Sequence, residues 1–559
     1  MIRALLTLLL LIPAVVRAAP PADRIFLGGP VLTMEGDQVA QAVAVQGGRI
    51  VAVGGAPAVL AWRGPNTEVT DLKGRALIPG FFESHAHFWL MANFAGQVDL
   101  SPPPAGAAGS IAELQAALRR ALAARPAGST EPLLGWGYDD TAMAERRHPS
   151  RADLDAVSTT VPILLTHISG HFVALNSAAL ARSGITAATE DPPGGRVRRQ
   201  PGSREPDSVL EENARSLVKD IDQAPSQEAR DGAYASTVLR LVALGYTTIV
   251  EHAAYAPLLP DLRRFADAGN LPVDLVAYVR LVDAKQPLPE WSRTYRNRLR
   301  IGGAKLIFDG SIQGYTGDLS RPYHRLRPED PPDYHGYASV SEEDARVLVD
   351  RLIEAREPFL THVNGDAAID LLQGAIEAAQ ARHGKDGPPP VLIHAQTLRA
   401  DQIARAISQG VEASFFVDHV YFWGDRHREI FLGPERAARI SPAHSAERAG
   451  LGFSLHDDAP VVPPDPIRTW WVAVNRRTSS GAVLGSGERL DTLAALRALT
   501  LAPARQQGEA DQKGSIAIGK LADLVILSAD PRGIAPARLR ELKVDETIKE
   551  GRTLYWRGP

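Results

Sequence analysis

The chain of 559 residues contains no cysteine. Disulfide bonds, a cysteine nucleophile and thiolate metal ligands are therefore all excluded. Any bound metal would have to be held by imidazole and carboxylate groups. The search for a reactive site is thereby narrowed to histidine, acidic residues and lysine.

The sequence also lacks a marked excess of one charge. It has 61 basic and 65 acidic side chains and a formal net charge of -4. Proteins that bind nucleic acid usually carry a clear basic excess, so nucleic acid is not expected as a partner. Beyond the N-terminus there is no apolar run of the roughly 20 residues that a membrane span needs, and no low-complexity tract.

The N-terminus resembles a secretion signal. Arg3 supplies a positive start, residues 4–16 form an apolar run, and residues 16–18 fit the small-x-small cleavage pattern. We expect residues 1–18 to be removed, which predicts a periplasmic or secreted protein with no stable membrane span. The alternative is a retained anchor, for which this apolar run is short.

Both ends of the mature chain show short β patterns separated by glycine and polar residues. They lie at 24–27, 31–34, 42–45 and 49–53, and again at 523–527, 544–548 and 551–555. This spacing is typical of a small antiparallel sheet. We predict one β-sandwich domain built from residues 19–79 and 500–559.

The middle of the chain alternates apolar strand patterns with helical stretches, which predicts an α/β fold with a parallel (β/α)8 TIM-like barrel over residues 80–499. The eight predicted strands end near Glu83, Glu251, Val279, Phe308, His362, His394, Phe415 and Leu455. A long stretch, about 89–241, has a strand of its own at 162–167. We predict that it is a cap inserted over the mouth of the barrel.

His85 and His87 follow the first barrel strand. At alternate positions of an extended chain both imidazoles point to the same face and can reach one cation. With 15 histidines in the chain, about 0.4 such pairs are expected by chance, so the pair needs further ligands nearby to be informative.

Further candidates stand at or near the C-terminal ends of later strands. They are Lys305, His362, His394 and Asp458. Active sites of parallel barrels lie at this end of the strands. A single strand-end histidine is more often a hydrogen-bonded core residue, but six such positions in barrel order favour a metal centre.

Five segments resemble the amidohydrolase superfamily, and within it the YtcJ-like group of metal-dependent amidohydrolases (amidohydrolase family 3). The segments are 79–87, 170–177, 303–311, 454–461 and 514–525. Together they span nearly the whole mature chain. They are specific for the superfamily and say much less about the substrate.

The resemblance implies a role for each matched residue. His85 and His87 would bind the more buried of two divalent ions, and His362 and His394 the second. Lys305, carboxylated by carbon dioxide, would bridge the two. Asp458 would ligate the first ion and shuttle protons between a metal-activated hydroxide and the leaving nitrogen. Zinc fits these ligands best, with manganese, iron and cobalt as alternatives.

Two positions leave the ligand assignment open. Asp457 and Asp458 are adjacent, so the choice of Asp458 depends on the alignment of residues 458–461. Lys305 could instead pair with Asp309 or extend towards solvent, in which case one metal is expected. Glu83 stands where the family has aspartate, which affects how His85 is oriented.

Four further residues are candidates for the substrate site. His171, in the cap, is expected to act in catalysis by contacting substrate or stabilising an oxyanion, or else it packs the cap on the barrel. His252 ends the second strand and could face the pocket. His419 and Trp423 belong to an aromatic stretch that suits either an apolar substrate wall or a core seam.

We therefore expect an enzyme that hydrolyses a carbon–nitrogen bond of a linear or cyclic amide in a small-molecule substrate. Ester, lactone or carbamate hydrolysis by the same site is the alternative within enzymes. A metal-binding regulatory protein without turnover is the alternative outside them. The sequence leaves a homodimer open.

Overall fold

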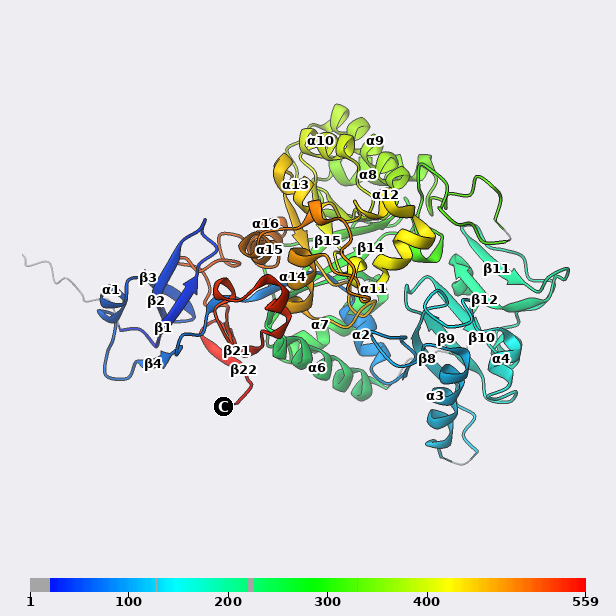
Figure 1. Cartoon of the computed structure of the whole chain (residues 1–559), viewed down its shortest axis with the longest axis horizontal. Helices are drawn as coiled ribbons and strands as arrows, with labels where there is room; N and C mark the ends of the chain where they lie inside the picture. Colours follow the sequence, from blue (N-terminus) through cyan, green and yellow to red (C-terminus); the bar gives the residue numbers. More distant parts are fainter. Residues whose placement is uncertain (1–20, 127, 220, 222–225, 329, 559) are drawn as a thin grey trace, which may run out of the picture.

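The computed structural model describes residues 21–126, 128–219, 221, 226–328 and 330–558. The predicted secretion signal lies outside the described residues. Three sheets organise the chain, and Figure 1 shows them side by side: the sheet of the chain ends at the left, the barrel in the middle and the cap at the right. No helix within the described ranges is long and apolar enough to cross a membrane.

The central sheet has eight parallel strands that follow one another in sequence order. They are almost entirely buried, as strands covered on both faces must be. The strands are β6 (Phe81–Ala86), β13 (Tyr246–Ala254), β14 (Asp274–Arg280), β15 (Leu299–Ile307), β16 (Phe359–Val363), β17 (Val391–His394), β18 (Glu412–Phe415) and β19 (Phe453–Leu455). The predicted α/β fold with a TIM-like barrel is confirmed, and the barrel is nearly closed, with β19 and β6 at its two edges.

Amphipathic helices cover the barrel. α8 shows why they form where they do: the Ser341 side chain accepts a hydrogen bond from the Asp344 N–H, acidic residues fill the first turn, and apolar residues recur at helical spacing on the buried face. The helices of this region are α2 (Phe88–Phe94), α6 (Gln227–Ala243), α7 (Leu259–Asp267), α8 (Glu342–Glu354), α9 (Asp366–His383), α10 (Ala400–Gln409), α11 (His419–Arg426), α12 (Gly433–Ala437), α13 (Ala443–Ala449), α14 (Pro466–Asn475), α15 (Thr492–Ala498) and α16 (Leu501–Gln506).

The cap is a six-stranded mixed sheet with its own apolar core. Its strands are β7 (Val98–Asp99), β8 (Leu133–Tyr138), β9 (Ile163–His167), β10 (Phe172–Leu175), β11 (Gly195–Arg199) and β12 (Pro206–Glu212). Its helices are α3 (Ile111–Ala123), α4 (Arg151–Asp155) and α5 (Ser177–Arg182). α2 and α6 flank this sheet in sequence but pack against β13 of the barrel.

The two ends of the chain share one sheet of eight strands, in which β5 of the N-terminal part pairs with β20 of the C-terminal part. Alternate residues of β1 feed different apolar clusters, with Phe26 in one and Ile25 in the other, as the two-residue period of a strand requires. The elements are β1 (Arg24–Leu32), β2 (Val39–Gln46), β3 (Arg49–Gly54), α1 (Ala56–Leu60), β4 (Glu68–Asp71), β5 (Leu77–Pro79), β20 (Leu524–Leu527), β21 (Val544–Lys549) and β22 (Arg552–Trp556).

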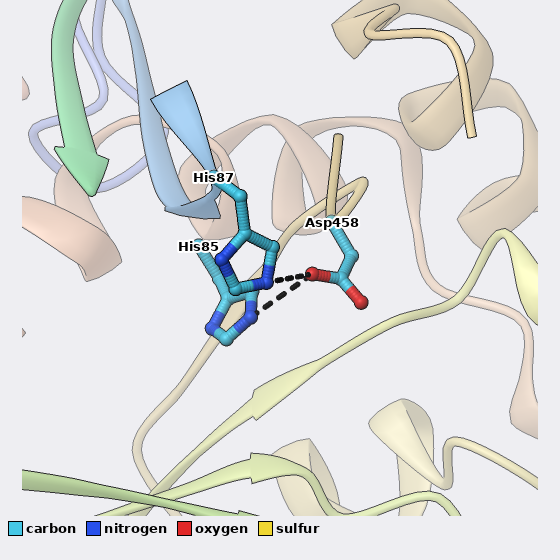
Figure 2. A group of neighbouring side chains, drawn as sticks. All are labelled: His85, His87 and Asp458. Atoms are coloured by element: carbon cyan, nitrogen blue, oxygen red, sulfur yellow. Dashed lines mark ion pairs between the residues drawn. The ribbon is translucent and has the colours of Figure 1, made fainter. Parts of the chain in front are cut away.

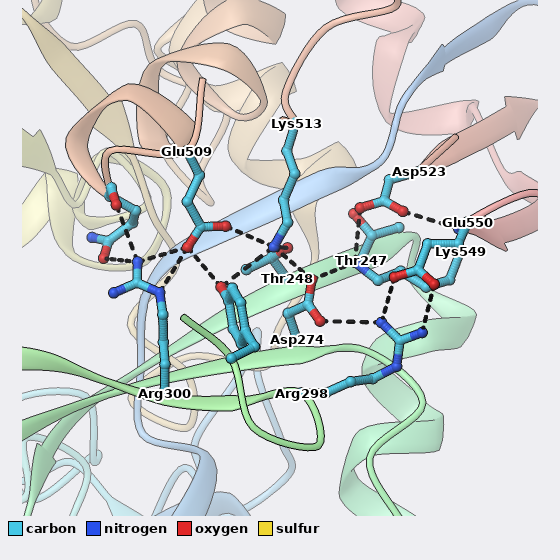
Figure 3. A network of polar contacts seen from close by, with 12 residues as sticks. Thr247, Thr248, Asp274, Arg298, Arg300, Glu509, Lys513, Asp523, Lys549 and Glu550 are labelled. Carbon is cyan, nitrogen blue, oxygen red and sulfur yellow. Dashed lines mark hydrogen bonds and ion pairs between the residues drawn. The ribbon is translucent and has the colours of Figure 1, made fainter. Parts of the chain in front are cut away.

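A buried network of ions joins this sheet to the N-terminal end of the barrel strands (Figure 3). Asp274, the first residue of β14, lies 2.5 Å from Lys513 Nζ and 2.6 Å from Lys549 Nζ. Lys549 also contacts Asp523 at 2.7 Å. All four side chains are buried, so each charge depends on its partners.

Candidate metal centre

His85, His87 and Asp458 meet at the C-terminal ends of the two edge strands of the barrel. Figure 2 shows both imidazoles, carried by the end of β6, pointing at the carboxylate that follows β19. Asp458 Oδ1 lies 3.0 Å from His85 Nε2 and 3.3 Å from His87 Nε2. Potential ligand atoms of the three residues all lie within 4.8 Å of one another, which suits a single cation.

The neighbours of these histidines fix how they are presented. His87 Nδ1 lies 2.8 Å from the His252 carbonyl oxygen, which can only accept, so Nδ1 carries the proton and Nε2 keeps its lone pair. Glu83 accepts the His85 backbone N–H at 2.9 Å. Burial lowers the pKa of His87, but the contact with Asp458 outweighs it and raises that pKa overall.

His362 and His394 lie next to this group. Their ring centroids are 4.5 Å apart, and the His394 ring is 5.0 Å from that of His85. Burial holds the pKa of His85, His362 and His394 well below the usual range, helped by neighbouring positive charges. All three are therefore neutral near pH 7, which is the form of imidazole that binds metals.

Lys305 projects from β15 into the same region and is 1% exposed. Its Nζ has no hydrogen-bond partner among the described residues, so the pairing with Asp309 weighed above is not formed. Burial lowers the pKa of Lys305 to about 7. A large part of this lysine is thus a free amine at neutral pH, as carboxylation by carbon dioxide requires.

The residues fit a divalent cation on the evidence of their unpaired atoms. Lys305 Nζ and His85 Nδ1 are buried and lack a hydrogen-bond partner in the part of the chain that the structure describes. Leaving such atoms unpaired costs about 1–3 kcal/mol each. A cation with nitrogen and oxygen ligands would offset that cost.

Backbone strain is concentrated at the same place. His394 has φ of 66°, Asp458 of 57° and Ala253, which follows His252, of 64°. Residues with side chains rarely adopt this left-handed region, at a cost of order 1–3 kcal/mol each, and such strain clusters at active sites.

The two adjacent aspartates have different partners. Asp457 accepts hydrogen bonds from Tyr246 Oη at 2.9 Å and from the backbone N–H groups of Ala459 and Asp465. Asp458 faces the histidines instead. Of the two, Asp458 is the one whose geometry suits a metal ligand.

A small cavity of about 20 Å³ lies beside these residues. That is room for one or two groups the size of a water molecule. The cap and the barrel both contribute to its wall, through Ser169, His171, Ser311, Gln313, His362, Asn364, His394, Phe416, His419, Asp458 and Val461.

The predicted substrate residues divide into two groups. His171 and His419 line the cavity, and His171 Nδ1 lies 2.8 Å from Glu212 Oε2. His252 lies outside the lining: its ring centroid is 3.8 Å from that of His85. Trp423 also lies outside it. Its Nε1–H donates to Asp139 Oδ2 at 2.9 Å and so ties α11 to the cap.

Sequence reasoning missed His456 and Glu212. His456 Nε2 lies 3.1 Å from His394 Nδ1, and His456 directly follows β19, two residues before Asp458. Its place after an apolar strand of the barrel could have revealed it. Glu212 approaches His171 only through pairing of cap strands, and no local motif marks it.

A second cluster of potential ligands, Asp139, Asp140 and His167, lies in the cap. The two oxygens of Asp139 already accept hydrogen bonds from Trp423, Arg426 and Thr141. Those contacts satisfy the carboxylate and neutralise its charge, so the cluster is explained without a metal.

Comparison with known proteins identifies the family of the chain. The chain matches the amidohydrolase family over residues 68–555, and it therefore belongs to that family, as its motifs predict. It is 28% identical to an N-substituted formamide deformylase of Arthrobacter pascens, over 96% of this chain and 98% of the relative. It is also 28% identical to the putative amidohydrolase YtcJ of Bacillus subtilis, over 95% and 99%.

Solved structures share the fold. An uncharacterised metal-dependent hydrolase from Pyrococcus horikoshii superposes with a TM-score of 0.70 at 22% identity, covering 92% of this chain and 99% of that one. The family and its relatives define the protein as a hydrolase of a metal-dependent class.

Proposed function

We propose that the protein hydrolyses the carbon–nitrogen bond of a small carboxamide, with N-substituted formamides as the first class to test. The observation that carries this proposal is Asp458, whose Oδ1 lies between His85 and His87 at the wall of a small cavity. The relative from Arthrobacter pascens is named for such substrates. A cavity of about 20 Å³ suits a formyl group better than a bulky acyl group.

The donor set suggests how cations would be held. His85, His87 and Asp458 would hold one divalent ion, and His362 and His394 a second, with carboxylated Lys305 contacting both. Zinc fits imidazole and carboxylate ligands. Once bound, such ions lower the pKa of water and polarise a carbonyl group.

Asp458 would carry the proton. Its carboxylate accepts a proton from the attacking water and then gives it to the substrate nitrogen, as the carbon–nitrogen bond breaks and its electron pair goes to nitrogen. His85 and His362 do not compete for that proton, because burial keeps their pKa low.

Asp458→Asn tests this role. We expect the variant to retain metal and to lose turnover by about 10²–10⁴-fold, the usual value of a positioned acid–base group. Metal analysis of protein produced with ample bicarbonate, with a screen of N-substituted formamides, lactams and esters, supplies both readouts. Asp425→Asn, in α11 and paired with Arg428 at 3.1 Å, is the matched control and should match wild type.

The alternatives give different results. Turnover of esters, lactones or carbamates without amide turnover would show that the site hydrolyses carbon–oxygen bonds or carbamates and not amides. A metal-loaded wild type without any turnover, combined with metal loss in Asp458→Asn, would favour a binding or regulatory protein. Export to the periplasm or medium, and a homodimer, are part of the proposal and are tested by fractionation and by mass in solution.

A further inference from the structure

Ser169 brings the cap to the wall of the cavity. It lies in the turn between β9 and β10 and is 9% exposed. It lines the same cavity as His362 and Asp458. Its hydroxyl is therefore one of the few cap groups that a substrate in the cavity would contact.

The neighbours of His167 fix the tautomer of that ring. His167 Nε2 lies 3.1 Å from Asp140 Oδ1, and an ionised carboxylate can only accept, so Nε2 carries the proton. On the other side, the Ser169 backbone N–H donates to His167 Nδ1 at 3.1 Å, so Nδ1 is an acceptor. The carboxylate can only accept a hydrogen bond and the backbone N–H can only donate one. Because the ring is also fully buried, these two contacts determine its tautomer.

This tautomer orients the Ser169 hydroxyl. Ser169 Oγ lies 2.8 Å from His167 Nδ1, and because Nδ1 accepts, the hydroxyl gives its only hydrogen to the ring. The oxygen also accepts the His171 backbone N–H at 3.2 Å. A hydroxyl has one hydrogen and two lone pairs, so Ser169 has an acceptor left for the cavity and no donor.

Asn364, another residue of the cavity wall, also has a free hydrogen-bond acceptor. The Asn364 side-chain N–H₂ donates to the Gly310 carbonyl oxygen at 2.9 Å, and its Oδ1 has no hydrogen-bond partner among the described residues. Gln313 Oε1 is likewise buried and without a partner in the described part of the chain. Acceptors from the cap and from the barrel thus line one small space.

We propose that this wall selects substrates with an N–H at the scissile nitrogen, that is, N-monosubstituted amides. The proposal rests on the proposed amide hydrolysis and goes beyond it by naming the substrate class. An ester presents an oxygen and a disubstituted amide a carbon at that place, and either leaves the buried acceptor unpaired. Sites built around a hydrogen bond reject analogues that lack it for this reason.

The test uses three substrates with one acyl group: N-butylformamide, N-butyl-N-methylformamide and butyl formate. The metal-loaded wild type is compared with Ser169→Ala, with Ser169→Thr, which keeps the hydroxyl, and with Ser203→Ala, an exposed cap serine, as control. Metal content and melting temperature are measured for every variant, so a folding defect is recognised separately.

We expect the wild type to prefer N-butylformamide over its N-methyl analogue in kcat/KM. Ser169→Ala should lower kcat/KM for N-butylformamide by about tenfold to hundredfold and leave butyl formate nearly unchanged. Ser169→Thr should restore most of the preference, and Ser203→Ala should behave as wild type.

Equal wild-type turnover of the two formamides would overturn the proposal, as would an equal loss on all three substrates in a folded, metal-loaded Ser169→Ala. If Ser169→Ala does not fold, the wild-type preference and Ser169→Thr still decide. Failure of the proposed function gives a different result, namely a metal-loaded wild type that hydrolyses no amide at all.

Discussion

Lys305 is the residue on which the proposed number of cations depends. It is buried, its Nζ lacks a hydrogen-bond partner among the described residues, and burial lowers its pKa to about 7. A free amine in this position can take up carbon dioxide and become a carboxylate-like ligand. An unmodified lysine, by contrast, would provide no ligand shared by the two groups of histidines.

We therefore expect protein produced with ¹³C-bicarbonate to show a carbamate carbon resonance that is absent in Lys305→Gln. The same variant should fall from about two metal ions per chain to about one or fewer, because the shared ligand is lost. Lys385→Gln, an exposed lysine that donates to the Ser408 carbonyl oxygen, is the control. Two bound ions without a carbamate signal would contradict the expectation.

Glu357 offers a second prediction, on stability. It is 5% exposed, lies just before β16, and its Oε1 has no partner in the described part of the chain. Burial raises its pKa to about 8, whereas an unfolded chain has a glutamate pKa of about 4.3. The folded state holds the proton more tightly, so its stabilising contribution is complete below the unfolded pKa and is lost as pH rises through about 8.

Glu357→Gln should therefore raise the melting temperature at pH 9 by roughly 1–3 °C and change it little at pH 5. Thermal unfolding followed by circular dichroism measures the difference. Glu354→Gln, an exposed residue at the end of α8, should give the same change at both pH values. An equal effect of Glu357→Gln at pH 5 and pH 9 would show that its charge is not the cause.

Residues with local signals could be predicted from sequence, and others could not. His85, His87 and Asp458 follow apolar runs, and their contact follows from the rule that strand ends of a barrel meet. Asp139 and Trp423, by contrast, are 284 positions apart and meet only because the cap docks on α11. The aromatic sequence around Trp423 suggests a substrate wall, but its indole N–H forms a hydrogen bond between the barrel and the cap.

Among the elements, β14 carries the network that joins the chain-end sheet to the barrel. Burial raises the pKa of Asp274, but Lys549 and Lys513 outweigh it and hold that pKa below the usual range. The stabilising contribution is present above the unfolded pKa of about 3.9 and is lost only as pH falls through the lower folded value. The junction should thus persist in mild acid.

Removing this carboxylate is expected to be costly. Asp274→Asn leaves two buried ammonium groups with less negative charge, and we expect a loss of about 3–5 kcal/mol in the free energy of unfolding. Asp267→Asn removes the partner of Arg296, whose side chain is 67% exposed, and should cost about 0–1 kcal/mol. Chemical denaturation of both variants checks the contrast, and similar losses in the two would show that burial is not the reason.

The barrel strands could be predicted as elements because their apolar runs are long and end in polar residues. The assignment of helices to domains is harder to read from sequence. α6 lies within the stretch expected to be a cap, yet it packs against β13, β21 and β22. Its amphipathic pattern predicts that one face is buried, but it does not indicate which sheet that face packs against.

At the scale of the whole molecule, the candidate metal centre lies across the seam of the barrel. β6 and β19 are the two edges of the central sheet and are not paired with each other in the strand order. Direct links cross this seam at Ser84, whose hydroxyl donates to the Leu455 carbonyl oxygen at 3.0 Å, and at His87, whose N–H donates to the Ala459 carbonyl oxygen at 2.7 Å. A cation held by His85, His87 and Asp458 would add a further link at the same edge.

Removal of metal by a chelator should therefore loosen the seam before it affects the rest of the molecule. At a free metal concentration of 100 times Kd, the bound ion stabilises the folded state by about 2.7 kcal/mol, so the melting temperature should fall on chelation and recover when zinc is restored. Hydrogen exchange should become faster in β6 and β19 and stay unchanged in β1 and β2 of the chain-end sheet. The Asp425→Asn control should respond to the chelator as wild type does. Uniform acceleration across all three sheets, or none in β6 and β19, would mean that the ion does not join the two edge strands.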